Sequence, residues 1–350
     1  MKKKIIIIIS ILFLILLSIL GLYLNSNNQL ENVNIENNSK ENDKLKQEEP
    51  KIEKNNLVSY NGKLKLNGVD LVNQYNEKIQ LKGISTHGLQ WYAKYANKEV
   101  MRQLRDEWHA NVFRIAMYTE ENGYIQNKEI KNKVYEIVDY AIDLDIYIII
   151  DWHILSDNNP NIHKTEALEF FGEVSKKYKD IPNVIFEICN EPNGNATWNN
   201  DIKPYAIDVI KEIRNNSDGI IIVGTGTWSQ DLIDAANSPL EFDNIMYACH
   251  FYAGTHTDWL RDRITEARKK IPIFISEWGT SRADGNGGIY LDESLKWINY
   301  MNDNNLSWVN WSLADKNESS ALLIPNTPTN DISDKYLTES GKFIKEQMKK

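Results

Sequence analysis

Residues 184–192 read VIFEICNEP, an apolar run of strand length that ends in a polar cluster. Seven other short apolar runs occur along the chain, spaced by roughly 25 to 40 residues. Runs of this length without polar alternation are typical of strands that are buried on both faces of a parallel sheet. The eight predicted strands are 79–84, 111–116, 147–151, 184–188, 220–223, 245–249, 273–276 and 308–311.

Segments with the period of an amphipathic helix lie between or after these runs, at 99–108, 132–144, 165–178, 202–214, 258–270, 292–302 and 338–350. Strands that alternate with helices over about 290 residues predict an α/β fold, a (β/α)8 TIM barrel. A doubly wound open sheet is the alternative, but no Gly-x-Gly-x-x-Gly motif follows the first run. The segment 64–72, with a turn at Asn67-Gly68, predicts an N-terminal β-hairpin.

The chain divides into three predicted parts: a signal peptide or signal-anchor helix at 1–24, a linker at 25–56 and the catalytic barrel at 57–350. The linker is rich in Asn, Glu and Lys, and it contains no aromatic residue. Such a composition cannot bury enough apolar surface to offset the entropy of ordering, so we expect this linker to be disordered.

The N-terminus carries Lys2, Lys3 and Lys4, followed by an apolar stretch at 5–24. A helix of this length can span a bilayer of ~30 Å at ~1.5 Å per residue. No Ala-x-Ala cleavage site is present, so an uncleaved membrane tether and a cleaved signal peptide both remain open. In both cases the lysines stay inside, and we expect an extracellular protein, secreted or anchored to the outer face of the membrane.

The composition limits the partners and the covalent cross-links. A net charge of −9 argues against a nucleic-acid partner, which needs a basic surface. The two cysteines, Cys189 and Cys249, fall at predicted strands, and a domain of this size needs no disulfide, so we expect two buried free thiols. One domain without an apolar surface run predicts a monomer.

Polar residues gather where the predicted strands end. In a barrel of this kind, the carboxyl ends of the strands meet on one rim and carry the catalytic groups. One such residue is often part of a structural ion pair, but polar groups at seven of eight strand ends predict an active site. These strand ends contain His87, Arg114, Asp151 with His153, Asn190 with Glu191, His250 with Tyr252, Glu277, and Asn310 with Trp311.

Glu191 and Glu277 end the fourth and seventh strands, nearly opposite each other across an eight-stranded barrel. Glycoside hydrolysis uses such a pair of carboxyl groups, and a gap of ~5 Å between them is the retaining geometry. Arg114 can keep Glu277 ionised, and Tyr252 can donate a hydrogen bond to the same carboxylate. Asp151 is a competing carboxylate that we expect to orient other groups.

Other neighbours have expected roles around the sugar. Asn190 can bind the sugar 2-hydroxyl, a contact that strengthens in the transition state. His153 and His250 can steady the sugar and the two glutamates, although each could equally be a structural histidine.

Metal catalysis is not predicted. The chain has neither a His-Glu-x-x-His nor a Cys-x-x-Cys motif. His87, His153 and His250 could bind a metal as in barrel amidohydrolases, but those enzymes have His-x-His on the first strand, where this chain has Thr86-His87-Gly88. We expect no metal and no cofactor.

Residues 60–345 resemble glycoside hydrolase family 5, and most closely its bacterial endo-β-1,4-glucanase (cellulase) branch. The specific motifs are NEP at 190–192 and ISEWG at 275–279, supported by LKGISTHGLQW at 81–91, DWHILSD at 151–157, ACHFYAG at 248–254 and WVNWSL at 308–313. The resemblance implies a retaining mechanism, with Glu191 as acid/base and Glu277 as nucleophile.

The resemblance also implies a set of sugar contacts. Arg114, His153, Asn190, His250, Tyr252 and Trp311 would surround the sugar at the point of cleavage, with Tyr118 as a further site tyrosine. His87 and Trp91 would lie on the glycone side, Trp228 on the aglycone side, and Lys316 and Glu318 at more distant glycone positions. Core packing is the alternative for Trp91 and Trp228.

The function that these residues imply is an endo-β-1,4-glucanase acting on cellulose or other β-glucans by double displacement. A β-mannanase and a mixed-linkage or xyloglucan-active glucanase remain open, because the family determines the mechanism better than the sugar. A non-catalytic glucan-binding protein is a remote alternative, since both glutamates are present. The lack of a recognisable binding module favours soluble or amorphous β-glucans over crystalline cellulose.

Overall fold

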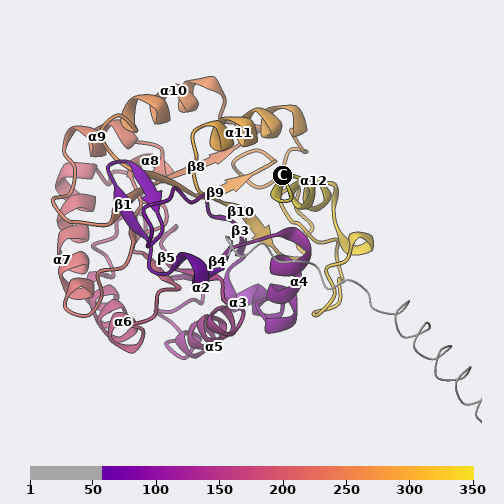
Figure 1. The fold of residues 1–350 in the computed structure, drawn as a ribbon, viewed down its shortest axis with the longest axis horizontal. Helices are drawn as coiled ribbons and strands as arrows, with labels where there is room; N and C mark the ends of the chain where they lie inside the picture. The colour runs from indigo at the N-terminus through magenta and orange to yellow at the C-terminus, as the bar shows by residue number, and fades with distance from the viewer. Residues whose placement is uncertain (1–56) are drawn as a thin grey trace, which may run out of the picture. The chain divides into compact units, whose positions relative to one another are not determined.

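The computed structural model describes residues 57–350, and within that part of the chain eight parallel strands close into a barrel in the order β10-β3-β4-β5-β6-β7-β8-β9. Figure 1 shows the helices arranged as a ring around these strands. The predicted (β/α)8 fold is confirmed. The strands are β3 (Lys82–Thr86), β4 (Val112–Tyr118), β5 (Tyr147–His153), β6 (Val184–Glu187), β7 (Ile221–Val223), β8 (Ile245–Tyr252), β9 (Ile273–Gly279) and β10 (Trp308–Leu313).

Every predicted helix is present, and the structure adds short elements that carry no clear period. One of them, α9, lies between β7 and β8, where no helix was predicted. The described helices are α2 (Val58–Asn61), α3 (Leu89–Tyr92), η2 (Ala93–Tyr95), α4 (Lys98–Trp108), α5 (Ile130–Asp143), α6 (Lys164–Lys177), η3 (Trp198–Ile202), α7 (Lys203–Arg214), α8 (Gly226–Ser229), α9 (Leu232–Asn237), α10 (Asp258–Ala267), α11 (Leu291–Asp303), η4 (Asp334–Tyr336) and α12 (Glu339–Met348).

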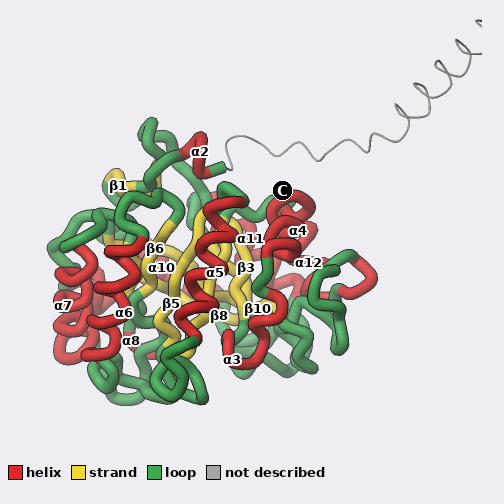
Figure 2. The backbone as a smooth tube through the Cα atoms, turned by 90° about the horizontal axis from the view of Figure 1, so that it is seen from below, coloured by secondary structure: helices red, strands yellow, loops and turns green. Residues whose placement is uncertain are grey.

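The predicted N-terminal hairpin forms from β1 (Lys65–Asn67) and β2 (Asp70–Val72), which pair antiparallel. Gly68 occupies the turn with φ of 63°, a left-handed conformation that suits glycine. Figure 2 shows β1 and α2 at one end of the barrel, with α3 and α8 toward the other. The carboxyl ends of the parallel strands are therefore left open at the end opposite the hairpin.

Side chains along the barrel strands alternate between the interior and the surrounding helices. Val112, Ile149 and Phe274 belong to a buried cluster inside the barrel. Their sequence neighbours Phe113 and Ile148 belong instead to the larger cluster that packs on the helices. This period of two determines which strand residues can reach the barrel axis.

The first strand begins later than predicted. The expected run was 79–84, whereas β3 begins at Lys82. Ile79 and Leu81 pack instead with Leu64 and Leu71 of the hairpin segment in the interior cluster. Side chains that close the end of a barrel and side chains of a barrel strand are both buried and apolar. The sequence pattern therefore does not distinguish them.

Both cysteines are buried and unpaired, as expected. Within residues 57–350, no helix is long and apolar enough to cross a membrane. The predicted signal or anchor at 1–24 and the linker at 25–56 lie outside the described residues.

Candidate active site

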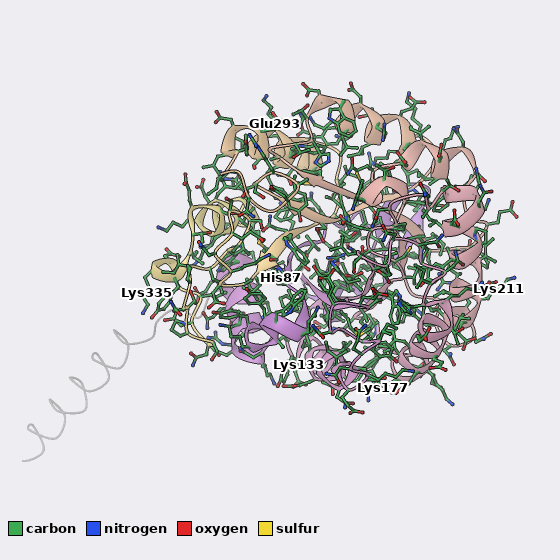
Figure 3. The ribbon with its side chains drawn as sticks, turned by 180° about the vertical axis from the view of Figure 1, so that it is seen from behind. His87, Lys133, Lys177, Lys211, Glu293 and Lys335 are labelled. Atoms are coloured by element: carbon green, nitrogen blue, oxygen red, sulfur yellow. The ribbon has the colours of Figure 1, made fainter. Side chains whose placement is uncertain are left out.

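A cleft of about 610 Å³ lies at the carboxyl ends of the barrel strands, and both predicted catalytic glutamates line it. Figure 3 views the barrel from the side opposite to Figure 1, and His87 lies near the middle of the ring of helices. Most of the predicted site residues line this cleft, namely His87, Trp91, Tyr118, His153, Glu191, Trp228, His250, Tyr252, Glu277, Trp311, Lys316 and Glu318. Arg114 and Asn190 are fully buried.

Glu191 and Glu277 approach each other across the cleft. One carboxylate oxygen of each glutamate and one ring nitrogen of His250 all lie within 4.8 Å of one another. Retaining glycosidases separate their two carboxyl groups by about 5 to 5.5 Å, whereas inverting enzymes leave a wider gap for water. This spacing is that of the retaining class.

An irregularity in β9 brings Glu277 to the axis. Ala248 of β8 pairs with Phe274 of β9, but His250 pairs with Glu277, so β9 contains one extra residue between the two pairs. Bulges of this kind re-aim side chains next to active sites. Ser276 and Glu277 are adjacent in sequence, yet both contact groups of the site, and strict alternation would have turned one of them away.

Glu277 accepts hydrogen bonds on both carboxylate oxygens. Tyr252 donates its hydroxyl to Oε1 at 2.8 Å, and Arg114 donates from Nη1 to Oε2 at 3.2 Å. Burial raises the pKa of Tyr252 well above its usual value, and the charges of Glu277 and Glu191 raise it further, so the phenol keeps its proton. These two contacts fix the orientation of the Glu277 side chain.

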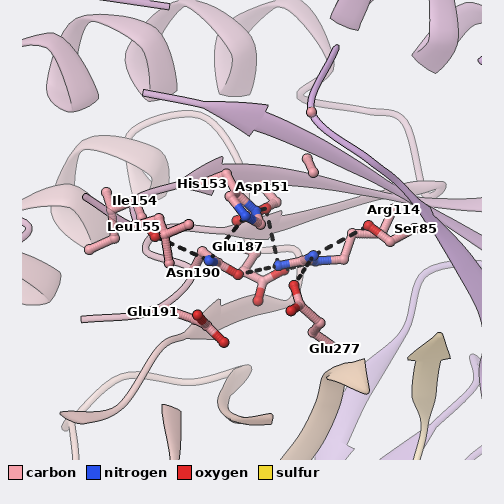
Figure 4. Close-up of polar contacts among 12 residues, drawn as sticks. Ser85, Arg114, Asp151, His153, Ile154, Leu155, Glu187, Asn190, Glu191 and Glu277 are labelled. Atoms are coloured by element: carbon pink, nitrogen blue, oxygen red, sulfur yellow. Dashed lines mark hydrogen bonds and ion pairs between the residues drawn. The ribbon is translucent and has the colours of Figure 1, made fainter. Parts of the chain in front are cut away.

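Arg114 connects the nucleophile candidate to the barrel interior, and Figure 4 shows its guanidinium at the centre of these contacts. Nε lies 2.6 Å from Glu187, Nη2 lies 2.7 Å from the Asn190 side-chain oxygen, and the same nitrogen lies 3.1 Å from Asp151. Burial acts to lower the pKa of Arg114, but the neighbouring carboxylates outweigh it and raise the pKa. The guanidinium therefore remains charged.

Asn190 is occupied within the protein. Its oxygen accepts from Arg114, and its amide nitrogen donates to the backbone oxygen of Ile154 at 3.1 Å and lies 3.3 Å from Nε2 of His153. The residue lies beneath the cleft and does not line it. A contact to the sugar 2-hydroxyl stays a prediction, and the structure shows Asn190 as a link between Arg114 and His153.

His250 connects Glu191 to a buried carboxylate. Its Nδ1 lies 2.9 Å from Glu191 and its Nε2 lies 2.9 Å from Ser276, whose hydroxyl donates to Glu187 at 2.6 Å. Burial acts to lower the pKa of His250, but the carboxylates of Glu187, 3.7 Å from Nε2, and Glu191 outweigh it and raise the pKa to about 9. The ring is thus a cation at neutral pH, with one N–H directed at Glu191.

Glu187 and Ser276 are two site residues that were not predicted from the sequence. Glu187 is fully buried, and although burial acts to raise its pKa, the charges of Arg114 and of the His250 ring, 3.7 Å away, lower the pKa to about 2. A glutamate inside an apolar parallel strand cannot stay unpaired at low cost. Its presence in the run at 184–188 was the signal that could have identified it.

Aromatic rings form the floor of the cleft. The His153 ring stacks on Tyr118 with centroids 4.1 Å apart and on Trp311 at 5.4 Å. Nδ1 of His153 lies 2.6 Å from Asp151, which orients the ring, as expected for that carboxylate. Burial and the charge of Arg114 lower the pKa of His153 to about 3, so the ring is neutral.

The remaining predicted contacts surround this floor. Trp91 and Trp228 are 44% and 45% exposed, which argues against core packing as their role. His87 lies 5.0 Å from Trp311 by ring centroids, and burial, followed by the charge of Lys316, lowers the pKa of its ring to about 3. Lys316 and Glu318 form an ion pair at the cleft edge.

Glu191, His250 and Glu277 are also close enough to offer ligands to a metal ion. Each of them already has a partner, because His250 bonds to Glu191 and Glu277 accepts from Tyr252 and Arg114. These hydrogen bonds account for the convergence of the three residues. Metal independence stays a prediction.

Comparison with known proteins identifies similar chains. Residues 72–317 match the family model described as cellulase (glycosyl hydrolase family 5). Over 295 residues, or 83% of this chain, the chain is 53% identical to Endoglucanase 5 of Pectobacterium carotovorum subsp. carotovorum and 55% identical to an endoglucanase of Clostridium saccharobutylicum. The matched segments span 58% and 66% of those two relatives.

Solved structures give the same result. The catalytic domain of Thermobifida fusca endoglucanase Cel5A, in complex with cellotetraose, is 32% identical with a TM-score of 0.81, covering 84% of this chain and 99% of that domain. The protein described as cellulase Cel5C_n is 43% identical with a TM-score of 0.81, covering 84% of this chain and 94% of that one.

Proposed function

This chain belongs to glycosyl hydrolase family 5, and we propose that it is a retaining endo-β-1,4-glucanase that hydrolyses internal bonds of β-glucans. The observation that carries the proposal is the pair of carboxyl groups, Glu191 and Glu277, which converge within 4.8 Å in the cleft. The endoglucanase names of the relatives and the cellotetraose bound to a similar catalytic domain support a β-1,4-glucan as the substrate class.

The first step forms a glycosyl-enzyme. Glu277 attacks the anomeric carbon, and its oxygens are already oriented by Tyr252 and Arg114. Glu191 donates a proton to the leaving oxygen and becomes a carboxylate. The cationic ring of His250, 2.9 Å away, stabilises the negative charge that develops there.

The second step releases the sugar. Glu191, now ionised, accepts a proton from a water molecule, whose oxygen attacks the anomeric carbon and displaces Glu277. Two inversions at the same carbon give net retention. Glu277 then leaves as a carboxylate, which Arg114 stabilises by charge and hydrogen bonding. In this mechanism Glu191 and Glu277 react directly in both steps, and His250, Tyr252 and Arg114 support them.

The exposed aromatic residues suit a polymeric substrate. Trp91 and Trp228 both line the cleft and keep nearly half of their surface exposed. Pyranose rings present an apolar C–H face, which a flat indole can cover. We therefore place sugars on both sides of the catalytic pair, as internal cleavage requires.

The two catalytic roles can be tested by alanine variants with azide. Glu277→Ala should reduce turnover by roughly 10⁴-fold or more without unfolding the barrel. With an activated aryl cellobioside, azide should restore turnover in Glu277→Ala and give an α-glycosyl azide, because azide takes the place of the nucleophile. Glu191→Ala should give the β-glycosyl azide by attack on the glycosyl-enzyme.

Near-wild-type activity in purified Glu277→Ala would overturn the assignment of the nucleophile. If Glu277→Ala gave the β-glycosyl azide and Glu191→Ala gave the α-glycosyl azide, the roles of the two glutamates would be the reverse of those proposed. Reducing-sugar release from carboxymethylcellulose, lichenan, xyloglucan and mannan, measured in parallel, identifies the preferred polymer. Dominant activity on mannan would contradict the glucanase proposal while preserving the mechanism.

We also propose that the protein is exported. The proposal rests on the lysines at 2–4 followed by the apolar stretch at 5–24, and the structure does not describe these residues. Fractionation of expressing cells should find the activity in the medium or on the outer face of the cell membrane. Activity confined to the cytoplasm would contradict it.

A further inference from the structure

Trp259 is an exposed aromatic residue at the catalytic end of the barrel that was not predicted as a site residue. It is 43% exposed and lies in the first turn of α10, which follows β8. Single exposed apolar residues are common on protein surfaces and by themselves indicate nothing. The position and the contacts of Trp259 distinguish it from such a residue.

The contacts of Trp228 show on which side of the catalytic glutamates this part of the cleft lies. The backbone N–H of Trp228 donates to the backbone oxygen of Pro192 at 3.0 Å, directly after Glu191. The acid/base protonates the leaving group, so the surface next to Glu191 faces the aglycone side of the bond that is cleaved. Trp228 therefore lies on the leaving-group side.

The turn that carries Trp228 is strained. Thr227, Trp228 and Ser229 have φ of 54°, 53° and 58°, a left-handed conformation that is costly for residues other than glycine. Strain of this kind persists where surrounding contacts hold it, often at ligand sites. The hydroxyl of Thr227 donates to one carboxylate oxygen of Asp231, which secures the turn.

Arg263 links that turn to Trp259. Its Nη1 donates to the backbone oxygen of Gln230 at 3.1 Å and to the second oxygen of Asp231 at 3.1 Å. The same guanidinium lies over the Trp259 ring, 5.3 Å from the centroid, in cation–π geometry. The indole is thereby coupled to the strained turn that carries Trp228.

His256 connects the cleft lining to Trp259. His256 lines the cleft and its ring lies 5.7 Å from the Trp259 ring. The backbone oxygen of His256 accepts from the buried Trp297 indole at 2.9 Å, which holds this segment in place. Trp259 therefore lies next to a cleft residue, on the side of the cleft that also carries Trp228.

From these contacts we infer that Trp259 is a second aromatic platform, binding sugars of the leaving chain beyond those covered by Trp228. The inference rests on the proposed function and extends it to substrate length. An enzyme with this extension prefers long glucan chains. Only these reach Trp259 when the glycosidic bond to be cleaved is positioned between Glu191 and Glu277. Arg263 is a positioning residue that holds the indole.

The test compares two substrates in one variant. The ratio of kcat/KM for cellohexaose to kcat/KM for an aryl cellobioside measures the contribution of distant aglycone sugars, since the aryl group occupies only the nearest position. Trp259→Ala should lower this ratio by about two- to tenfold, the effect expected for one lost aromatic contact. Arg263→Met should lower it in the same direction. A general folding defect reduces both rates and leaves the ratio unchanged.

Tyr75→Ala is the matched control, because Tyr75 is an aromatic residue that is 57% exposed just after β2 of the hairpin, at the far end of the barrel. It should keep the wild-type ratio. If Trp259→Ala also keeps the wild-type ratio, the platform is wrong and the glucanase proposal stands. If the wild-type protein hydrolyses no β-glucan, the proposed function is wrong and this inference falls with it.

Discussion

At the residue scale, the charge state of His250 is the property that couples the two halves of the site. Its ring links Glu191 on one side with Ser276 and Glu187 on the other. Because Glu187 also pairs with Arg114, and Arg114 with Glu277, contacts run from Glu191, the proposed acid/base, to Glu277, the proposed nucleophile. A change of charge at one of these residues is therefore expected to shift the pKa values of the others.

We predict that Glu187→Gln lowers the pKa of His250 from about 9. A neighbouring anion favours the protonated ring, so its removal favours the neutral form. In the wild-type protein the ring should keep its proton at neutral pH and lose it as the pH rises through about 9. In the variant the loss should begin at lower pH, and the alkaline limb of kcat/KM should move in the same direction.

NMR titration of the His250 ring measures this pKa directly. Ser276→Ala is the control, since it removes the bridging hydroxyl but keeps the charge of Glu187, and its shift should be smaller. An unchanged His250 pKa in Glu187→Gln would show that Glu187 serves the fold alone.

At the element scale, close contact between neighbouring strands determines where Glu191 lies. Gly224 follows β7, and a Cβ atom at this position would overlap the backbone oxygen of Cys189 and crowd that of Asn190. The segment that ends in Glu191 is thus set by a glycine on the adjacent strand. The bulge in β9 does the same for Glu277 on the other side.

We predict that Gly224→Ala reduces kcat and also destabilises the barrel, because the added methyl group displaces the backbone that carries Asn190 and Glu191. Gly68→Ala is the matched substitution at the far end, where φ is 63° and no atom lies within 4 Å of the added Cβ. It should cost about 1 kcal/mol of stability, from the left-handed backbone alone, and leave kcat unchanged. Steady-state kinetics and thermal unfolding of both variants measure this difference, and equal effects on kcat would contradict it.

At the scale of the whole molecule, stability and catalysis are located at opposite ends of the barrel. Leu64, Leu71, Ile79 and Leu81 close one end with the interior cluster, whereas the cleft occupies the other. Active sites of this fold lie on the carboxyl end of the strands, and the opposite end contributes to stability. The hairpin is therefore expected to support the fold without touching the substrate.

We predict that Leu71→Ala lowers the free energy of unfolding by roughly 2–5 kcal/mol, as for other buried leucines, with kcat/KM unchanged below the unfolding transition. Leu71 is 3% exposed, whereas Leu295 on α11 is 41% exposed. Leu295→Ala should therefore change stability by less than about 0.5 kcal/mol. Denaturant unfolding measures the free energy of unfolding of both variants. Similar losses of stability would contradict a stabilising role for the hairpin.

The fold class and the two catalytic candidates were predictable from local patterns in the sequence. Burial on both faces leaves a local record, because a strand such as 184–188 must be apolar along its length and the chain must turn polar where it reaches the open rim. The acidic residues at those ends, Glu191 and Glu277, could therefore be recognised, and the structure brings them together.

The buried groups that connect those glutamates depend on contacts between distant parts of the chain. Glu187 and Ser276 stand 89 positions apart, and their 2.6 Å contact depends on the closure of the barrel and on one extra residue in β9. Neither the bulge nor the left-handed turn at Trp228 has a local signal, because neighbouring strands and side chains stabilise them. Long-range packing, which no short run of residues encodes, sets the charge of His250 and the position of Trp259.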